Sequence, residues 1–401
     1  MKRVLLMLPL LACAHTPQAP ARDDVDLHRR ATVVDTHSDV TQAIVYEGYD
    51  FAARHDFLHE DLPRAREGGL DAEFFSIWIN PEQFKPESWY AESLHQIEAV
   101  QAMARKNAGA VALVRTAAEV RANAERGVFS VLFGLEGGHS LLPGTEEEQL
   151  EHLRRFAQLG VRYMTLTWSI SNPIGGSSGD GGERTGLTPF GRRVLEEMDR
   201  LGIAADVSHV SDPLFWDAIR AVKKPVLASH SSAQALANVP RNMTDSMIKA
   251  VGVGGGAVCV NFFSGFLDEA HFEAVKPYFP QMKGMSTAQA QRFLRDKKLP
   301  PVAVSRIADH IDHVVKVAGV DHACLGSDFD GIPTIPVGLE DASKLPWLTA
   351  ELRRRGYTKD QLEKILGGNV LRVLEANERG GAAAAQAGAA RSVGRTVSDI
   401  K

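Results

Sequence analysis

Short apolar runs rich in β-branched residues alternate along the chain with segments whose apolar residues recur at helical spacing. The apolar runs predict eight strands, at 32–39, 70–79, 128–136, 161–168, 203–209, 225–231, 256–262 and 323–328. The helical spacing predicts helices at 91–106, 146–159, 189–201, 213–222, 244–251 and 302–318. This alternation is typical of a parallel sheet and favours an α/β fold, a (β/α)8 TIM-type barrel with insertions. An open doubly wound sheet is the competing architecture.

Three segments between the predicted elements are longer than ordinary connections and are predicted as insertions, at 80–88, 169–186 and 263–301. The segment 169–186 is rich in Gly and Ser and follows a predicted strand directly. We expect it to be a mobile loop beside the active site, because a linker at this point would divide the fold.

The N-terminus has the layout of an export signal. Met1-Lys2-Arg3 is basic, residues 4–12 are almost wholly apolar, and the run ends at Cys13. This arrangement predicts a bacterial lipoprotein-type signal peptide over 1–12, acylation of Cys13 and a Pro/Ala-containing tether over 13–29. The expected location is the bacterial cell envelope, with a lipid anchor in the membrane. A plain signal peptide, which would leave a periplasmic or secreted protein, is the alternative.

The tether leads to a predicted domain over 30–375, followed by an Ala/Gly-rich tail over 376–401 that is predicted to be disordered. The 401 residues carry a net charge of −5 without a basic stripe, which argues against a nucleic-acid partner. Cys259 and Cys324 each lie in an apolar run. They are predicted as buried free thiols, although the sequence alone leaves a disulfide open.

Polar residues interrupt the first predicted strand. Asp35, His37 and Asp39 alternate with Val34, Thr36 and Ser38, so we expect the three ionisable side chains to share one face. A charged face on a parallel strand is costly unless its charges are paired or bind a metal.

Other candidate ligands stand at the carboxyl ends of four further strands: Glu136, His209, His230 and Asp328. Active sites of barrels lie on that face, and imidazoles with carboxylates suit zinc. The pattern predicts two ions, one held by His37 and Asp39 and one by His209 and His230, with Glu136 between them. Two ions at this spacing can share a hydroxide and polarise a carbonyl, which leaves Asp328 free to move protons.

These residues resemble the membrane dipeptidases, or renal dipeptidases, of the metal-dependent amidohydrolase superfamily. The resemblance covers about residues 30–375 and rests on seven motifs in order: Asp-x-His-x-Asp (35–39), Glu-Gly-Gly-His (136–139), Arg-Tyr-Met-Thr-Leu-Thr (162–167), Asp-Val-Ser-His (206–209), Ser-His-Ser-Ser-Ala (229–233), Arg-Asn (241–242) and Gly-Ser-Asp-Phe-Asp-Gly (326–331).

The resemblance implies a binuclear zinc enzyme that hydrolyses dipeptides by attack of a metal-bridging hydroxide, and it suggests a homodimer. His37, Asp39 and Glu136 would bind one zinc, and Glu136, His209 and His230 the other. Asp328 would bind substrate and pass a proton from the bridging water to the departing amine. Arg241 would bind the C-terminal carboxylate of the small peptide, since guanidinium recognises carboxylate in bidentate fashion.

One position departs from the animal members of this family. They carry a His after Thr-Leu-Thr that contacts the substrate carbonyl, whereas this chain has Trp168. Tryptophan donates a hydrogen bond but accepts no proton, so Trp168 is predicted to contact substrate with an altered role in oxyanion stabilisation. His139 is a candidate substitute, or a residue lying behind the ligands.

Two other functions compete with a dipeptidase. Another amide hydrolase of the superfamily is disfavoured because such relatives usually open with His-x-His and often bridge their metals through a modified lysine. A non-catalytic envelope lipoprotein that binds peptide or metal is disfavoured by Asp328, which binds no metal in the predicted site.

Overall fold

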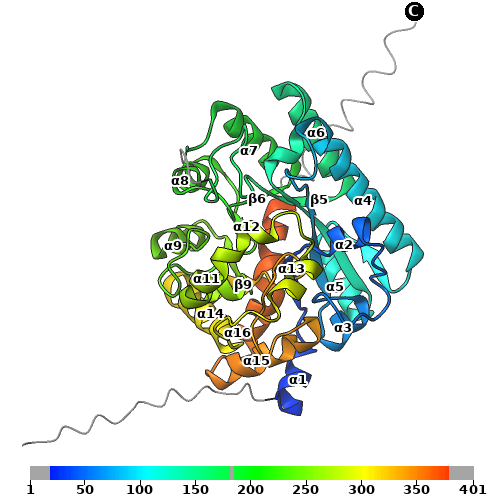
Figure 1. Ribbon diagram of the computed structural model, residues 1–401, viewed down its shortest axis with the longest axis vertical. Coiled ribbons are helices and arrows are strands. Elements are labelled where there is room, and N and C mark those ends of the chain that lie inside the picture. Colours follow the sequence, from blue (N-terminus) through cyan, green and yellow to red (C-terminus); the bar gives the residue numbers. More distant parts are fainter. Residues whose placement is uncertain (1–18, 181–184, 379–401) are drawn as a thin grey trace, which may run out of the picture.

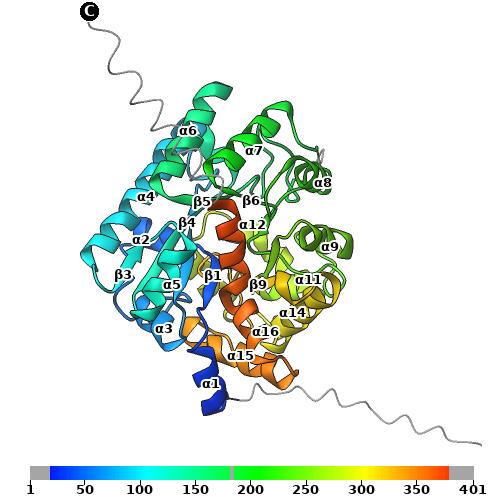
Figure 2. The ribbon, with the colours of Figure 1, turned by 180° about the vertical axis from the view of Figure 1, so that it is seen from behind.

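Nine parallel strands form the central sheet of the protein, which a computed structural model describes over residues 19–180 and 185–378 (Figures 1 and 2). The strands are β1 (Val34–Ser38), β2 (Ala72–Trp78), β3 (Val111–Leu113), β4 (Phe129–Glu136), β5 (Val161–Thr165), β6 (Ala204–Asp206), β7 (Leu227–Ala228), β8 (Ala257–Val260) and β9 (Ala323–Leu325). Their order is β2-β1-β9-β8-β7-β6-β5-β4-β3, and β2 also pairs with β4.

The pairing of β2 with β4 closes the sheet into a barrel. It is continuous from Ala72↔Ser130 to Trp78↔Glu136, which leaves no open edge between the two strands. The short β3 pairs with the first part of β4 and β5 with the last part, so β3 lies outside the ring of eight. The predicted (β/α)8 barrel is confirmed, and closure excludes the open doubly wound sheet.

Helices surround the barrel (Figure 1). They are α1 (Arg22–His28), α2 (Val40–Tyr46), α3 (Leu62–Glu67), α4 (Trp89–Lys106), α5 (Ala117–Glu125), α6 (Glu146–Leu159), α7 (Pro189–Leu201), α8 (Asp212–Ala221), α9 (Asp245–Val253), α10 (Ser264–Leu267), α11 (Glu269–Val275), α12 (Phe279–Met282), α13 (Thr287–Leu294), α14 (Ser305–Ala318), α15 (Leu345–Arg354) and α16 (Lys359–Glu363). The six predicted helices correspond to α4, α6, α7, α8, α9 and α14. The insertion 263–301 contains α10 to α13.

The sequence prediction missed β3 and the helices α1, α2, α3, α15 and α16. It also missed the helix α5. The strand has only three residues, too few for a periodic pattern. The helix carries a readable signal, because Thr116 caps its first turn and Glu119 bonds back to the Thr116 amide. That capping box is visible in the sequence as Thr-x-x-Glu.

Several barrel strands end earlier than predicted. His209 and Asp328 adopt φ angles of 66° and 63°, in the left-handed region that ends strand pairing. His209, His230 and Asp328 therefore lie beyond the strand ends, whereas His37 and Glu136 lie on β1 and β4 themselves.

A final helix at 369–378 closes the other end of the barrel, where it lies across the centre of Figure 2. Its residues Val370, Leu371, Val373 and Leu374 pack in one apolar cluster with inward-facing strand residues such as Val34 and Phe74. The helix passes the predicted domain boundary at 375, because Asn377 is buried and donates to the carbonyl of Pro225. Residues 379–401 of the predicted tail lie outside the described ranges.

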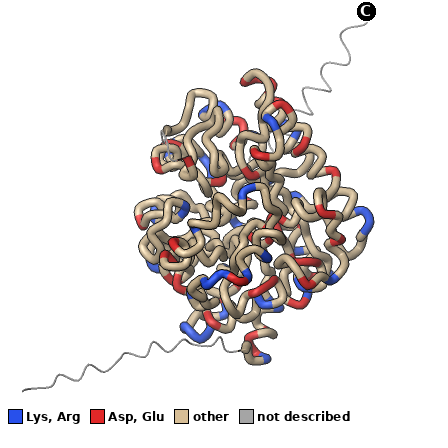
Figure 3. The backbone as a smooth tube through the Cα atoms, viewed as in Figure 1, with Lys and Arg blue, Asp and Glu red and all other residues tan. Residues whose placement is uncertain are grey.

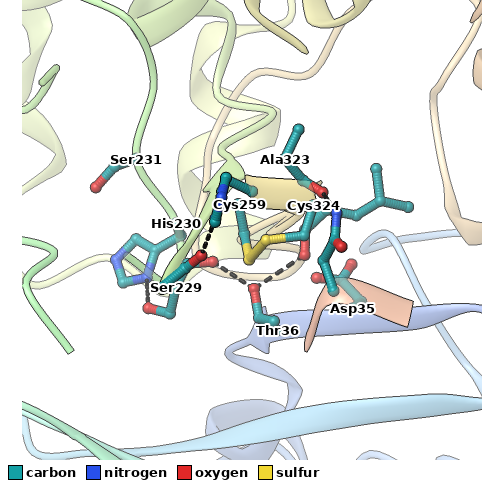
Figure 4. The surroundings of a disulfide bond; sticks show 12 residues. Asp35, Thr36, Ser229, His230, Ser231, Cys259, Ala323 and Cys324 are labelled. Carbon is teal, nitrogen blue, oxygen red and sulfur yellow. Dashed lines mark hydrogen bonds between the residues drawn. A yellow bond between two sulfur atoms is a disulfide. The ribbon is translucent and has the colours of Figure 1, made fainter. Parts of the chain in front are cut away.

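A disulfide joins Cys259 on β8 to Cys324 on β9, so the prediction of free thiols is wrong. The two residues are register partners on adjacent strands, with Cα atoms 4.1 Å apart. Both are fully buried in the barrel interior. Figure 4 shows the disulfide beside Thr36, whose hydroxyl donates to the carbonyls of Ser229 and Leu325. The bond thus lies beneath the strand end that carries His230.

The predicted tether over 13–29 is wrong in its second half. Residues Arg22–His28 form α1, where His28 is buried and bonds Thr349 of α15 and the carbonyl of Gly68. The domain therefore begins before residue 30. The predicted signal segment and Cys13 lie outside the described residues.

Within the described ranges, no helix has both the length and the apolar character needed to cross a bilayer. Lys and Arg residues are interspersed with Asp and Glu over the face drawn in Figure 3.

Candidate active site and metal centre

A β-bulge in β1 brings His37 into the barrel. Asp35 pairs with Glu73 and Ser38 with Phe75, so β1 contains one more residue than β2 between these two pairs. The extra residue lets Thr36 and His37 both face inward, while Asp35 and Ser38 face the surrounding helices. The prediction that Asp35 and His37 share a face is wrong for this reason. Asp35 instead accepts from the amide of Ser327, at 2.8 Å.

Glu136 lies between two groups of imidazoles. Its Oε1 is 3.1 Å from His209 Nε2 and 3.6 Å from His230 Nε2. Its Oε2 is 3.5 Å from His37 Nε2 and accepts from Ser76 Oγ at 3.2 Å. Each oxygen thus faces a different set of nitrogen atoms.

Asp39 and Asp328 complete the cluster on the side of His37. One carboxylate oxygen of each lies 4.0 Å from His37 Nε2. Backbone bonds join the two loops, from Asp39 N to Phe329 O at 2.8 Å and from Asp328 N to His37 O at 3.0 Å. Gly331 leaves room for both carboxylates, because a Cβ at this position would displace the side-chain oxygens of Asp39 and Asp328.

The donor set fits a metal centre. Ligand atoms of His37, Glu136 and His230 lie within 4.8 Å of one another, as do those of His37, Asp39 and Asp328. His37 Nε2 and Asp39 Oδ1 are buried without a hydrogen-bond partner among the described residues. The Nε2 atoms of His209 and His230 are only 2.9 Å apart. These convergent, unsatisfied atoms are what a bound cation would require.

Residues that the sequence reasoning missed orient these ligands. Asp206 accepts the hydroxyl of Ser229 at 2.6 Å, and Ser229 Oγ is 2.8 Å from His230 Nδ1. Because that hydroxyl gives its proton to Asp206, it accepts from Nδ1–H, which leaves the lone pair of His230 on Nε2. Tyr163 Oη likewise contacts His37 Nδ1 at 2.7 Å. All three orienting residues lie inside the seven recognised motifs, which was the available signal.

Asn261 is a further missed residue. It follows β8, which like β2 carries no site residue assigned from the sequence, and its amide donates to Asp328 Oδ2 at 2.8 Å. The bond leaves Asp328 Oδ1 facing His37.

The charges of the cluster are unbalanced. Burial lowers the pKa of His37, but Glu136, Asp39 and Asp328 outweigh it and raise that pKa to about 10. Burial and Glu136 raise the pKa of Asp39 well above its usual value. Burial and the charge of Arg241 lower the pKa of His209 to about 4. Three carboxylates around one imidazole therefore favour additional positive charge.

A cavity of about 650 Å³ opens above this cluster. Its lining includes six of the predicted site residues: Asp39, Glu136, Trp168, His209, Arg241 and Asp328. His37 and His230 lie deeper and are almost fully buried. Trp168 packs on Trp78, with ring centroids 4.9 Å apart. His139 is buried behind the ligands and faces the carbonyl of Ile79 at 3.0 Å, so it does not replace the missing His.

Arg241 lines the cavity with a guanidinium that has no acidic partner in the described part of the chain. Its single hydrogen bond there runs from Nη2 to the carbonyl of His230, at 3.2 Å.

A closed barrel with histidines and carboxylates gathered at the carboxyl ends of its strands defines a metal-dependent hydrolase of the (β/α)8 class. Comparison with known proteins makes this assignment more specific. The chain belongs to the membrane dipeptidase family, peptidase family M19, whose profile matches residues 22–387. This is a family of metallo-dipeptidases, as the resemblance in the sequence implied.

Individual relatives agree with the family assignment. The chain is 34% identical over 373 residues to the uncharacterized dipeptidase C965.12 of Schizosaccharomyces pombe, covering 88% of this chain and 82% of that protein. Among solved structures it resembles the dipeptidase AC, a family M19 metallo peptidase, with a TM-score of 0.72, 29% identity and coverage of 86% and 98% of the two chains. It also resembles a metallo peptidase from Rhodobacter sphaeroides, with a TM-score of 0.71, 28% identity and coverage of 86% and 99%.

A second group of acids lies on the other face of the β1 bulge. Glu60, Glu73 and Asp35 are fully buried, and Ser38 donates its hydroxyl to Glu60. The carboxyls of Glu60 and Glu73 face each other. Both oxygens of Glu73 and one of Glu60 lack a hydrogen-bond donor within the described ranges. Burial, with repulsion by Asp330 and Asp35, raises the pKa of Glu60 to about 8. Burial and Glu60 raise the pKa of Glu73 well above its usual value.

We predict that Glu73→Gln stabilises the protein at alkaline pH. An acid whose pKa is higher in the folded than in the unfolded protein contributes to the stability of the fold at a pH below its unfolded pKa. This contribution is lost as the pH rises through the pKa of the folded state. The neutral amide avoids the loss and can donate to Glu60. The melting temperature of the variant minus that of the wild type should be about 3 °C or more higher at pH 9 than at pH 5. Exposed Glu125→Gln on α5 is the matched control, and an unchanged difference would contradict the prediction.

Proposed function

We propose that this chain hydrolyses the amide bond of dipeptides that carry a free C-terminal carboxylate, at a centre of two zinc ions. The observation that supports this most directly is Glu136, whose two oxygens face separate sets of imidazoles beneath the cavity that holds Arg241. The Rhodobacter sphaeroides relative was solved with a phosphinate mimic of the dipeptide L-Ala-D-Ala, which supports a dipeptide as the ligand.

In this proposal His37, Asp39 and Glu136 would hold one ion, and Glu136, His209 and His230 would hold the other. The contacts between these atoms and the excess of carboxylate charge support the division. Bound zinc supplies Lewis acidity and an activated water, the two things that amide hydrolysis needs from a metal.

Asp328 is proposed as the group that moves the proton. Asn261 holds its Oδ2, so Oδ1 faces the cluster and the cavity and is the atom that takes up the proton. Burial and the charge of Glu136 raise the pKa of Asp328 to about 6, against the opposing effect of His37. A carboxyl with a pKa in this range can accept a proton and release it to an amine at neutral pH.

Arg241 and Trp168 are proposed to position the peptide. The guanidinium of Arg241 has donors free for a bidentate pair with the C-terminal carboxylate. Trp168 lines the cavity between Trp78 and His209, with ring centroids 4.9 Å and 6.4 Å from theirs. Its indole N–H can donate to the substrate but cannot shuttle a proton.

We also propose that the chain is attached to the bacterial envelope through acylated Cys13. The N-terminal sequence supports export, and the disulfide between Cys259 and Cys324 is typical of an oxidising compartment. A homodimer remains an expectation from the family resemblance.

The first prediction from this proposal concerns metal and substrate. Purified protein should hydrolyse dipeptide acids, lose this activity on full chelation and regain it with zinc at two ions per chain by elemental analysis. C-terminal amides of the same dipeptides should be hydrolysed at least about 100-fold less well, because Arg241 then has no carboxylate to pair with. Activity that survives complete metal removal would contradict a metal-dependent mechanism.

The second prediction separates proton transfer from metal binding. Asp328→Asn should leave the zinc content near two per chain and lower kcat by about 10²- to 10⁴-fold, since an amide cannot take up the proton. Replacement of exposed Asp360 by Asn on α16 is the control. Full turnover in the Asp328 variant would contradict the assigned role.

The third prediction concerns the anchor. Cells that express the full chain should incorporate labelled fatty acid into the protein and retain it in the membrane fraction, because several acyl chains anchor stably. Cys13→Ser should abolish both the label and the retention. A variant that still fractionates with the membrane shows that another contact holds the protein there, and the lipoprotein assignment would then fail.

A further inference from the structure

The cavity above the metal centre has an apolar wall that comes from one insertion. The segment 263–301, between β8 and α14, contributes these apolar residues to the lining: Phe263, Phe266, Phe279, Met282 and Met285. In Figure 1, α12 and α13 of this insertion lie over the barrel in front of β9. The volume of about 650 Å³ lies within the range of about 300–1,000 Å³ that encloses drug-sized ligands. There is room for a dipeptide with a large side chain.

The wall begins beside Arg241. The guanidinium carbon of Arg241 lies 5.4 Å from the ring centroid of Phe266, and Phe266 packs edge-on against Phe263 at 4.8 Å. The side-chain amide of Asn242 donates to the carbonyl of Phe266 at 2.8 Å, which ties the two segments together. A peptide carboxylate bound at Arg241 shares its Cα with the side chain of the C-terminal residue. That side chain is therefore held against the wall.

Polar contacts at three places hold the insertion in position. His271 of α11 bonds the carbonyl of Pro300 at 2.7 Å and the hydroxyl of Thr334 at 2.9 Å. Gln291 of α13 contacts the ring of His59 at 2.9 Å. Lys283 pairs at 2.8 Å with Glu82, in the insertion 80–88. These contacts tie the insertion to the rest of the chain, and Lys283, which also lines the cavity, pairs with a partner outside the apolar set.

We propose that this wall selects dipeptides whose C-terminal residue has a large apolar side chain, an inference that rests on the proposed function. Such a side chain gains by leaving water against Phe and Met, whereas a charged one would lose hydration opposite these Phe and Met side chains, which offer no hydrogen bond. Met282 and Met285 are unbranched and adapt to different shapes. Selection is therefore by apolar area, and it accepts both aliphatic and aromatic residues.

The test is a pair of matched substrate series on the zinc-loaded protein, Ala-Xaa and Xaa-Ala, with Ala, Leu, Phe, Asp and Lys as Xaa. The kcat/KM values for Ala-Leu and Ala-Phe should exceed those for Ala-Asp and Ala-Lys by about 10- to 100-fold. The Xaa-Ala series should vary less, because its variable side chain is one residue away from Arg241.

Met282→Arg tests the wall by a gain of activity. The new cation should raise kcat/KM for Ala-Asp and lower it for Ala-Phe, changing their ratio by about tenfold or more. Gln281→Arg is the matched control, since Gln281 is an exposed neighbour on α12 that does not line the cavity. A gain toward an acidic substrate cannot come from a misfolded wall, and a ratio that is unchanged by Met282→Arg would overturn the assignment.

The outcomes separate this inference from the proposed function. A flat Ala-Xaa series with rapid hydrolysis overturns the selectivity and leaves the dipeptidase intact. A steep Xaa-Ala series with a flat Ala-Xaa series overturns the placement of the C-terminal side chain. If the zinc-loaded protein hydrolyses none of these dipeptides, the proposed function itself fails.

Discussion

The buried carboxylate of Glu136 is the constraint on which the rest of this structure depends. A carboxylate with little access to water is costly unless positive or hydrogen-bonding groups surround it, and here three imidazoles do so from two sides. The continuous pairing of β2 with β4 places Glu136 beside Trp78 at the mouth of the closed barrel. Gly137, at φ 98°, then turns the chain away, where a side chain would meet the ring of His139.

The groups around Glu136 are oriented by a less exposed layer of polar residues. Asp206 and Ser229 set the proton on His230, and Tyr163 contacts the far nitrogen of His37. Asn261 and the backbone of residues 328–331 hold Asp328 and Asp39 against each other. This layer comes from β5, β6 and the segments after β7, β8 and β9, which are consecutive neighbours in the barrel. The acids beneath the β1 bulge show that the protein also buries carboxyl groups close to the site, where burial raises their pKa values and favours the neutral form.

The barrel strands and the insertion 263–301 form different parts of the cavity lining. The ends of the barrel strands supply the polar floor of the cavity, the cluster of histidines and carboxylates around Glu136. The chemistry of this cluster suits amide hydrolysis in general. The segment 263–301 supplies an apolar wall. In our proposal this wall contacts the side chain of the substrate rather than its scissile bond. Floor and wall meet at Arg241, which faces the cluster through His230 and the wall through Phe266. Because the apolar residues of the wall are distinct from the histidines and carboxylates of the floor, they can change without altering the floor's chemistry, a common arrangement in barrel enzymes.

The sequence by itself determined the eight barrel strands, six surrounding helices and the residues that converge in the candidate site, because each depends on local periodicity or on a motif at a strand end. Only the tertiary structure decided which way those residues face. One extra residue in β1 reverses the alternation and separates Asp35 from His37. The disulfide, the docking of α1 and the apolar wall each join residues far apart in the chain, and local pattern contains no information about such distant pairs.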